Sequence, residues 1–220
     1  MFAAASAPDS AVPGLFGQLN DFARNTSWLH APMQAYAGYG VVVFALLLLA
    51  GWWLARTRGP RTMAAALWAG AGMLLAVGLN QPIVKSVHEA RPYTVHPHIL
   101  VLAHRSADYS FPSDHAVMAG AVAAGLWLVS QRLGVIAAVA ALLMAFARVY
   151  IAAHYPHDVL FGLAMGAGIV LFGWLLLATL LTRLVERLAR TPLRPLLIDD
   201  WRAPADETTE TRRRRRRVTA

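Results

Sequence analysis

Apolar residues are concentrated in five long stretches of the chain, and polar residues gather between them. These stretches cover residues 37–55, 63–84, 116–130, 135–153 and 159–181. A helix of about 20 apolar residues crosses the hydrocarbon core of a bilayer. The pattern therefore predicts an all-α fold, a polytopic transmembrane helix bundle with about five spans. Only four residues separate the third stretch from the fourth, which predicts a tight hairpin.

A weaker apolar pattern precedes the first stretch. Within residues 14–30 the apolar side chains recur at helical spacing, at Leu15, Phe16, Leu19, Phe22 and Ala23. This spacing predicts an N-terminal amphipathic helix on the outer surface of the membrane rather than a sixth span. At the other end, the composition after Leu193 is typical of disorder. We therefore divide the chain into an N-terminal extracytoplasmic segment (1–35), a membrane-embedded domain (36–181) and a basic cytoplasmic tail (182–220).

The overall composition agrees with a membrane protein. Hydrophobic residues make up 57% of the 220 residues and charged residues 15%, whereas charged residues form about a quarter of an ordinary soluble domain. The absence of cysteine excludes disulfides, zinc–thiolate sites and thiol nucleophiles. The first residues have no basic region followed by a continuous apolar core, so we expect no cleaved signal peptide.

Basic residues are distributed unevenly, and their distribution predicts the orientation of the spans. Eleven of the twenty basic residues lie from Arg183 onward, six of them at 212–217. If the spans alternate, this tail shares one side with the arginines of two short connections, Arg56, Arg58, Arg61 and Arg132. The positive-inside rule makes that side cytoplasmic. We expect the tail to set this topology or to contact anionic head groups, and we expect no nucleic-acid partner.

Three polar clusters then fall together on the extracytoplasmic side. The loop from 85 to 113 opens with VKSVHEARPY and closes with FPSDHAV, and RVYIAAHYPHD closes the fourth stretch. Their chemically capable residues are Lys85, Arg91, Ser113, His115, Arg148, His154 and Asp158. Three cations, two histidines and a carboxylate suit phosphoryl transfer, because cations neutralise phosphate oxygens while imidazoles can serve as nucleophile and general acid.

The same residues resemble the motifs of the type-2 phosphatidic acid phosphatase superfamily, which also includes the vanadium haloperoxidases. The family pattern is K-x6-RP, then PSGH, then SR-x5-H-x3-D. Its first two motifs correspond to residues 85–92 and 112–115 of this chain. The third is matched at full spacing by Arg148, His154 and Asp158. This resemblance covers the polar clusters, and the apolar stretches around them extend it over most of the membrane-embedded domain.

The chain departs from the family pattern at three points. Ala147 replaces a serine, which removes one possible hydrogen bond to phosphate. Asp114 replaces a glycine, which adds a negative charge that must cap a helix or pair with a donor. Lys85 lies one residue nearer to Arg91 than in the family, so the two would point about 120° apart on a continuous helix. Because Pro92 disfavours helical geometry in Arg91, we expect the helix to end earlier and Arg91 to reorient.

The resemblance implies a role for each matched residue. His154 would be the nucleophile, Asp158 would hold its other ring nitrogen, and His115 would protonate the leaving oxygen and then activate water. The remaining matched residues would bind phosphate oxygens: Lys85, Arg91, Ser113 and Arg148. No metal or cofactor is expected. We interpret His157, which lies outside the motif spacing, as structural or supporting, and the PSDH sequence also suits the N-cap of a helix.

The implied substrate is a lipid phosphate, because the polar clusters lie where the spans meet the membrane interface. Within the superfamily, the PSDH sequence and the N-terminal segment look most like the bacitracin-resistance type of undecaprenyl-diphosphate phosphatase. A phosphatidic acid or phosphatidylglycerophosphate phosphatase would use the same residues. A vanadate-dependent haloperoxidase and a non-catalytic membrane protein are the remaining hypotheses, and the sequence predicts no oligomeric state.

Overall fold

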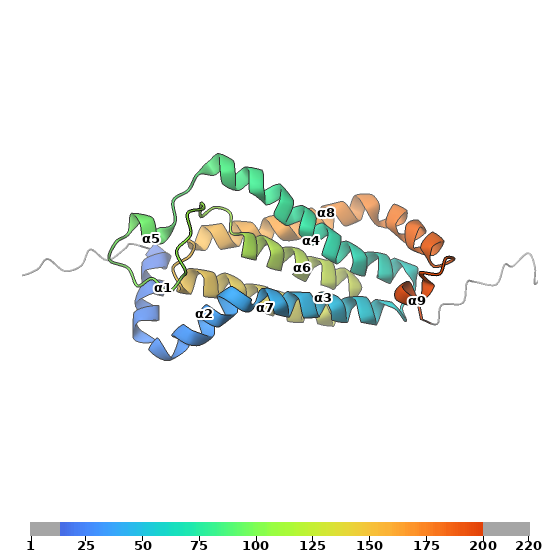
Figure 1. The fold of residues 1–220 in the computed structure, drawn as a ribbon, viewed down its shortest axis with the longest axis horizontal. Coiled ribbons are helices and arrows are strands. Elements are labelled where there is room, and N and C mark those ends of the chain that lie inside the picture. Colours follow the sequence, from blue (N-terminus) through green and yellow to red (C-terminus); the bar gives the residue numbers. More distant parts are fainter. Residues whose placement is uncertain (1–13, 200–220) are drawn as a thin grey trace, which may run out of the picture.

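The computed structural model describes residues 14–199, and the regular elements in this range are all helical (Figure 1). They are α1 (Gly14–Asn25), the 3-10 turn η1 (Ser27–Leu29), α2 (His30–Tyr39), α3 (Val41–Ala55), α4 (Pro60–Val87), α5 (Pro92–Val95), α6 (Asp114–Val129), α7 (Gln131–Tyr150), α8 (Pro156–Leu188) and α9 (Arg194–Leu197). The predicted all-α class is confirmed. Figure 1 shows α3, α4, α6, α7 and α8 running lengthwise beside one another as an elongated bundle.

The five predicted apolar stretches largely coincide with these long helices, which differ in length. By length and composition, three segments could cross a membrane: Pro60–Val95, Gln131–Tyr150 and Pro156–Leu188. Ser27–Tyr39 and Val41–Ala55 form a pair bent by 54°, which makes a fourth span if the pair counts as one. The apolar helix α6 has 16 residues, about 24 Å at 1.5 Å per residue. The described part of the chain thus has three or four full-length spans and a shorter α6.

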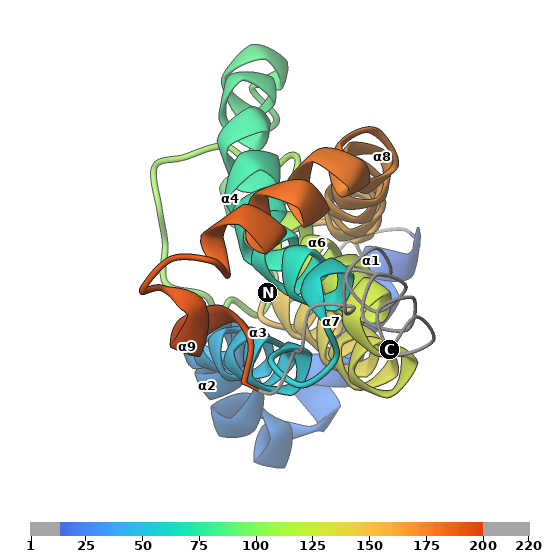
Figure 2. The same cartoon turned by 90° about the vertical axis from the view of Figure 1, so that its right-hand side faces the viewer.

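Helix α6 lies at the centre of the bundle, packed against α4, α7 and α8 (Figure 2). Its approach to α8 depends on two glycines. A Cβ on Gly120 would lie 2.2 Å from the carbonyl oxygen of Leu163, and one on Gly166 would lie 2.0 Å from that of Val117. Larger residues would therefore separate the two helices. Their close packing brings the first turn of α6 beside the first turn of α8, where the polar clusters lie.

The connection between α6 and α7 consists of Ser130 alone. The predicted tight hairpin is therefore confirmed, and α7 begins at Gln131 rather than near Val135. The predicted limits of the membrane-embedded domain, at 36 and 181, both fall inside helices, namely α2 and α8. Apolar composition locates the spans, but a helix continues past its apolar part wherever the following residues still favour helical geometry.

Helix α1 confirms the predicted N-terminal helix and is docked on the bundle. Phe16 is buried, and Asn20 exchanges hydrogen bonds of 2.8 and 3.0 Å with the backbone of Leu100. Leu15 and Phe22 remain 57% and 43% exposed. One side of the helix thus holds the long loop between α4 and α6, while exposed apolar side chains remain available to a membrane surface.

The C-terminal part differs from the prediction. The predicted disorder after Leu193 is wrong for residues 194–199, because α9 and the residue after it pack against the bundle. Ile198 is 1% exposed, and Trp52 Nε1 donates a hydrogen bond to the carbonyl of Leu196 at 3.0 Å. Burial of these few apolar side chains orders residues 194–199, although the tail after Leu193 as a whole has a composition typical of disorder. The rest of the tail, with its polyarginine run, lies outside the described residues.

Candidate active site

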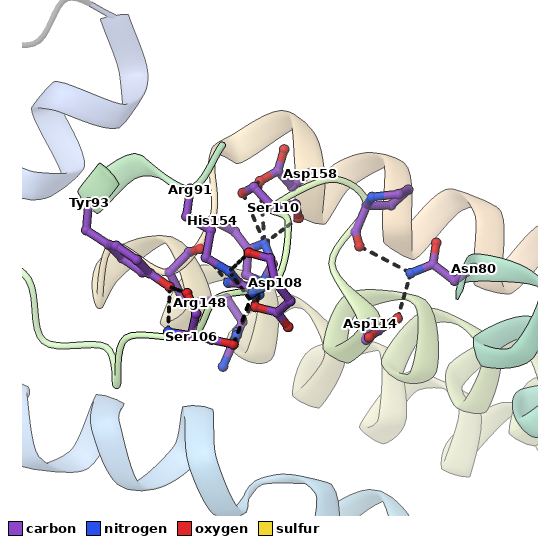
Figure 3. A network of polar contacts seen from close by, with 12 residues as sticks. Asn80, Arg91, Tyr93, Ser106, Asp108, Ser110, Asp114, Arg148, His154 and Asp158 are labelled. Carbon is purple, nitrogen blue, oxygen red and sulfur yellow. Dashed lines mark hydrogen bonds and ion pairs between the residues drawn. The ribbon is translucent and has the colours of Figure 1, made fainter. Parts of the chain in front are cut away.

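Three segments meet at one end of the bundle: the loop between α4 and α6, the first turn of α6, and the connection between α7 and α8 (Figure 3). The backbone N–H of Ser113 donates to the carbonyl of Asp158 at 3.3 Å, which joins α6 to α8. Arg91 Nη1 donates to the carbonyl of Ala153 at 2.9 Å, which joins the loop to the α7–α8 connection. Residues far apart in the sequence are therefore brought together in one polar cluster.

His154 occupies the middle of this cluster and is 2% exposed. Its Nδ1 lies 2.8 Å from the carbonyl oxygen of Ser110. Because a carbonyl can only accept, Nδ1 carries the proton and Nε2 keeps its lone pair. That nitrogen lies 3.1 Å from Arg148 Nη2 and 3.3 Å from Arg91 Nη1. The unprotonated nitrogen thus faces two guanidinium groups, where an anion would be attracted.

The environment of His154 favours the neutral ring. Burial lowers the pKa of His154 below its ordinary value of 6.5, and the charges of Arg148 and Arg91 lower it further, although the hydrogen bond to Asp158 opposes them. A neutral imidazole with a lone pair on Nε2 is the form that can act as a nucleophile. The proton on Nδ1 and the lowered pKa of His154 therefore both leave Nε2 unprotonated.

Asp158 is fully buried and holds the ring of His154 together with Ser110. Its Oδ2 lies 3.4 Å from His154 Nδ1, accepts the backbone N–H of Tyr155 at 2.9 Å, and accepts the hydroxyl of Ser110. The carbonyl of Ser110 is nearer to Nδ1 than the carboxylate is. The sequence missed Ser110, because a single serine in a long loop has no spacing that distinguishes it.

Arg91 is 7% exposed and is fixed by a second residue that the sequence missed. Its Nε and Nη2 lie 3.0 and 2.8 Å from Asp108 Oδ1. Burial alone would raise the pKa of Asp108, but its hydrogen bond with Ser106 and the charge of Arg91 lower it overall. The carboxylate is thus ionised and orients the guanidinium toward His154.

Two buried donors in the cluster have no protein partner. Ser113 is fully buried at the N-cap position of α6, yet its hydroxyl makes no capping hydrogen bond. Within residues 14–199, the Ser113 Oγ and the Arg148 Nε are both buried without a hydrogen-bond partner. Buried polar groups of this kind are rare and call for a ligand or a functional explanation. Both belong to residues predicted to bind phosphate oxygens.

Asp114, the residue that departs from the family glycine, turns away from His154 (Figure 3). Its Oδ1 accepts hydrogen bonds from Asn80 Nδ2 at 2.7 Å and from Gln81 Nε2 at 2.9 Å. Asn80 also donates to the carbonyl of Pro112 at 3.2 Å. Two amides on α4 therefore satisfy the extra charge and hold the start of α6 in place. The sequence showed the charge but not its partners.

The remaining two predicted residues make fewer contacts. His115 is half-buried on the first turn of α6, within electrostatic range of the charges of Arg148 and Arg91. It makes no hydrogen bond with the described residues. Lys85 is exposed near the C-terminal end of α4 and makes no hydrogen bond or ion pair within the described ranges. Its predicted role in binding phosphate stays a prediction.

Comparisons with known proteins point to one family. The model of the PAP2 superfamily matches residues 65–182, a range that includes every predicted site residue. The chain is 30% identical to the undecaprenyl-diphosphatase BcrC of Bacillus subtilis over 146 residues, which cover 66% of this chain and 74% of that protein. It is 29% identical to the bacitracin transport permease protein BcrC of Bacillus licheniformis over 158 residues, covering 71% and 76% of the two chains.

Two further matches are also phosphatases by name. The chain is 34% identical to a lipid A 1-phosphatase of Rhizobium johnstonii over 127 residues, covering 54% of this chain and 52% of that one. Among solved structures, a transmembrane PAP2-type phosphatidylglycerolphosphate phosphatase from Bacillus subtilis has 23% identity and a TM-score of 0.50, covering 79% of this chain and 85% of that one. This last similarity concerns the fold alone.

Proposed function

The chain belongs to the PAP2 superfamily and is a membrane lipid phosphatase, and we propose that it hydrolyses a polyprenyl diphosphate at the extracytoplasmic face through a phosphohistidine intermediate. The observation that supports this most is the state of His154. Its Nδ1 donates to a backbone carbonyl, which leaves a lone pair on Nε2, and that nitrogen faces two arginines. A neutral nucleophile beside two cations suits attack on a phosphate.

In the first step, His154 Nε2 attacks the terminal phosphorus and the bond from phosphorus to the leaving oxygen breaks. His115 donates a proton to that oxygen, so that the lipid monophosphate leaves with its charge reduced. The positive charge that develops on the His154 ring is stabilised through Nδ1–H by the carbonyl of Ser110 and the carboxylate of Asp158. In the second step, His115 takes a proton from water, the water attacks phosphorus, and His154 leaves with its lone pair restored.

The transferred phosphoryl group would be held by donors that already point into the cluster. Arg148 Nε and the Ser113 hydroxyl are buried without partners, and phosphate oxygens would satisfy both. The free backbone N–H groups at the start of α6 add further donors and a favourable dipole. Arg91 contributes charge from a fixed position beside Asp108. All of these groups are protein donors, and we propose that they hold the phosphoryl group without a metal ion or cofactor.

The choice of a polyprenyl diphosphate rests on the similarity to the two BcrC proteins. A phosphatidic acid or phosphatidylglycerophosphate phosphatase would use the same site residues and is the second candidate. Purified protein would be assayed with undecaprenyl diphosphate, phosphatidic acid, phosphatidylglycerophosphate, and vanadate with halide. We expect the highest kcat/KM for undecaprenyl diphosphate. A clear preference for a glycerophospholipid, or halide oxidation, would refute this proposal.

The intermediate can be trapped directly. Substrate labelled in its terminal phosphate would be quenched without acid and the labelled peptide mapped. We expect the label on His154 and none in His154→Ala, while His104→Ala, a change at an exposed loop histidine, serves as the matched control. Label on another residue, or turnover by folded His154→Ala, would rule out the proposed nucleophile.

The proposal also includes an orientation. Arginines at the opposite end of the bundle from the site favour a cytoplasmic C-terminus by the positive-inside rule. The site would then face the outside of the membrane. We further propose that the basic tail contacts anionic head groups of the inner leaflet.

A further inference from the structure

His157 is a solvent-exposed histidine in direct contact with the buried carboxylate of Asp158. Its Nε2 lies 3.0 Å from Asp158 Oδ1 and 2.8 Å from Glu89 Oε1. The side chain is 59% exposed, whereas that of Asp158 is fully buried. The ring stacks on Tyr155 with an interplanar angle of 8° and a centroid distance of 5.5 Å, and Phe111 lies 5.9 Å away on a tilted plane. His157 therefore has a defined position despite its exposure.

The two oxygens of Asp158 have different environments. Oδ2 is held by the Ser110 hydroxyl and the Tyr155 N–H and faces His154. Oδ1 is buried, makes no hydrogen bond of normal geometry within residues 14–199, and has His157 Nε2 as its near polar neighbour. A proton on that nitrogen would stabilise Oδ1 electrostatically. This proton would also oppose any rotation of the Asp158 carboxylate that moves Oδ2 away from His154.

Glu89 completes a closed set of contacts around the nucleophile. Its side chain accepts from His157 at 2.8 Å, and its backbone carbonyl accepts the N–H of Ser110 at 2.8 Å. The carbonyl of Ser110 in turn accepts from His154 Nδ1. Glu89 is thus connected to His154 by two routes, one through Ser110 and one through His157 and Asp158. It also lies two residues before Arg91, on the same loop.

We propose that His157, held by Glu89, is a positioning residue that fixes the carboxylate of Asp158 and thereby supports the charge that develops on His154 during phosphoryl transfer. This inference rests on the proposed function, because it assigns His157 an effect only on the step in which His154 becomes charged. His157 touches neither the phosphate donors nor the proposed nucleophilic nitrogen. Its effect should therefore fall on kcat and not on substrate binding.

Two substitutions separate a donor role from a stacking role. His157→Gln keeps an N–H donor and loses the ring, whereas His157→Phe keeps the ring and loses the donor. We expect His157→Phe to lower kcat about tenfold with KM within about twofold, because the N–H that faces Asp158 Oδ1 is lost. His157→Gln should stay within about threefold of the wild type. His98→Phe, at an exposed loop histidine, is the matched control.

A double variant tests whether His157 acts through Asp158. In an Asp158→Asn background, His157→Phe should cause no further loss of kcat, because the charge on which it acts is gone. Thermal unfolding in detergent identifies any variant that is merely unstable. Activity of His157→Phe above that of His157→Gln, or a rise in KM alone, would overturn the inference. So would loss of wild-type turnover in EDTA, since Glu89, His157 and Asp158 would then be holding a cation.

The labelling experiment distinguishes failure of the proposed function from failure of this inference. If wild-type protein forms no phosphohistidine at His154, the mechanism itself is wrong. If the label forms at His154 at the same rate in the wild type and in folded His157→Phe, then the mechanism stands and the role of His157 is refuted.

Discussion

Ser110 and Ser113 are two fully buried serines, three residues apart, with opposite hydrogen-bonding states. The hydroxyl of Ser110 donates to the carboxylate of Asp158, whereas that of Ser113 has no partner among the described residues. Replacing each by alanine removes the same atom from a similarly buried position. We predict that Ser110→Ala destabilises the protein and that Ser113→Ala does not.

The magnitudes follow from the two environments. A hydrogen bond to a charged group contributes about 1.5–3 kcal/mol, so Ser110→Ala should lower the free energy of unfolding by that amount. A buried polar group without a partner costs about 1–3 kcal/mol, so Ser113→Ala should leave stability unchanged or raise it by about 1 kcal/mol. If Ser113 binds a phosphate oxygen in the transition state, however, its loss should lower kcat/KM roughly 10- to 150-fold.

Both properties would be measured on the same detergent-purified samples. Thermal unfolding followed by tryptophan fluorescence gives the order of stability, and phosphate release from undecaprenyl diphosphate gives kcat/KM. The expected pattern for Ser113→Ala is a stable protein with low activity. A Ser113→Ala variant as unstable as Ser110→Ala, or one with wild-type kcat/KM, would contradict the assignment of Ser113 to the phosphate.

Three other predictions follow from the same geometry. The acid limb of the kcat/KM profile should lie below pH 6.5, because the active His154 is neutral and its pKa is lowered. Arg91→Gln should move this limb to higher pH, because one of the charges that lower the pKa of His154 is removed. A limb at the same pH in this variant would contradict the prediction. Asp114→Gly should lower stability by about 1.5–3 kcal/mol but kcat less than tenfold, because the buried Asn80 amide loses its shorter hydrogen bond and keeps only the one to Pro112. Adding Asn80→Leu should restore part of the stability in a thermal-unfolding assay. A cysteine introduced at the exposed Ala107 should react with an impermeant reagent from outside, and labelling only after permeabilisation would reverse the proposed topology.

Much of the architecture could be predicted because membrane proteins obey a strong local constraint. Every backbone polar group in a bilayer must be satisfied within its own segment, so long apolar stretches become helices. The short hairpin at Ser130 and the N-terminal helix follow from similarly local patterns. The prediction of disorder is wrong at residues 194–199, because the composition of the whole tail does not show that Leu197 and Ile198 are buried against the bundle.

The sequence by itself determined which residues could do chemistry. Arg148, His154 and Asp158 lie close along the chain, and their order and spacing predict them as site residues. Only the tertiary structure decided how they are held. The contacts of His154 with Ser110 and of Arg91 with Ala153 join residues 44 and 62 positions apart. No periodicity in the sequence connects such pairs, because their distance is set by how closely α6 and α8 pack and by the path of a long loop.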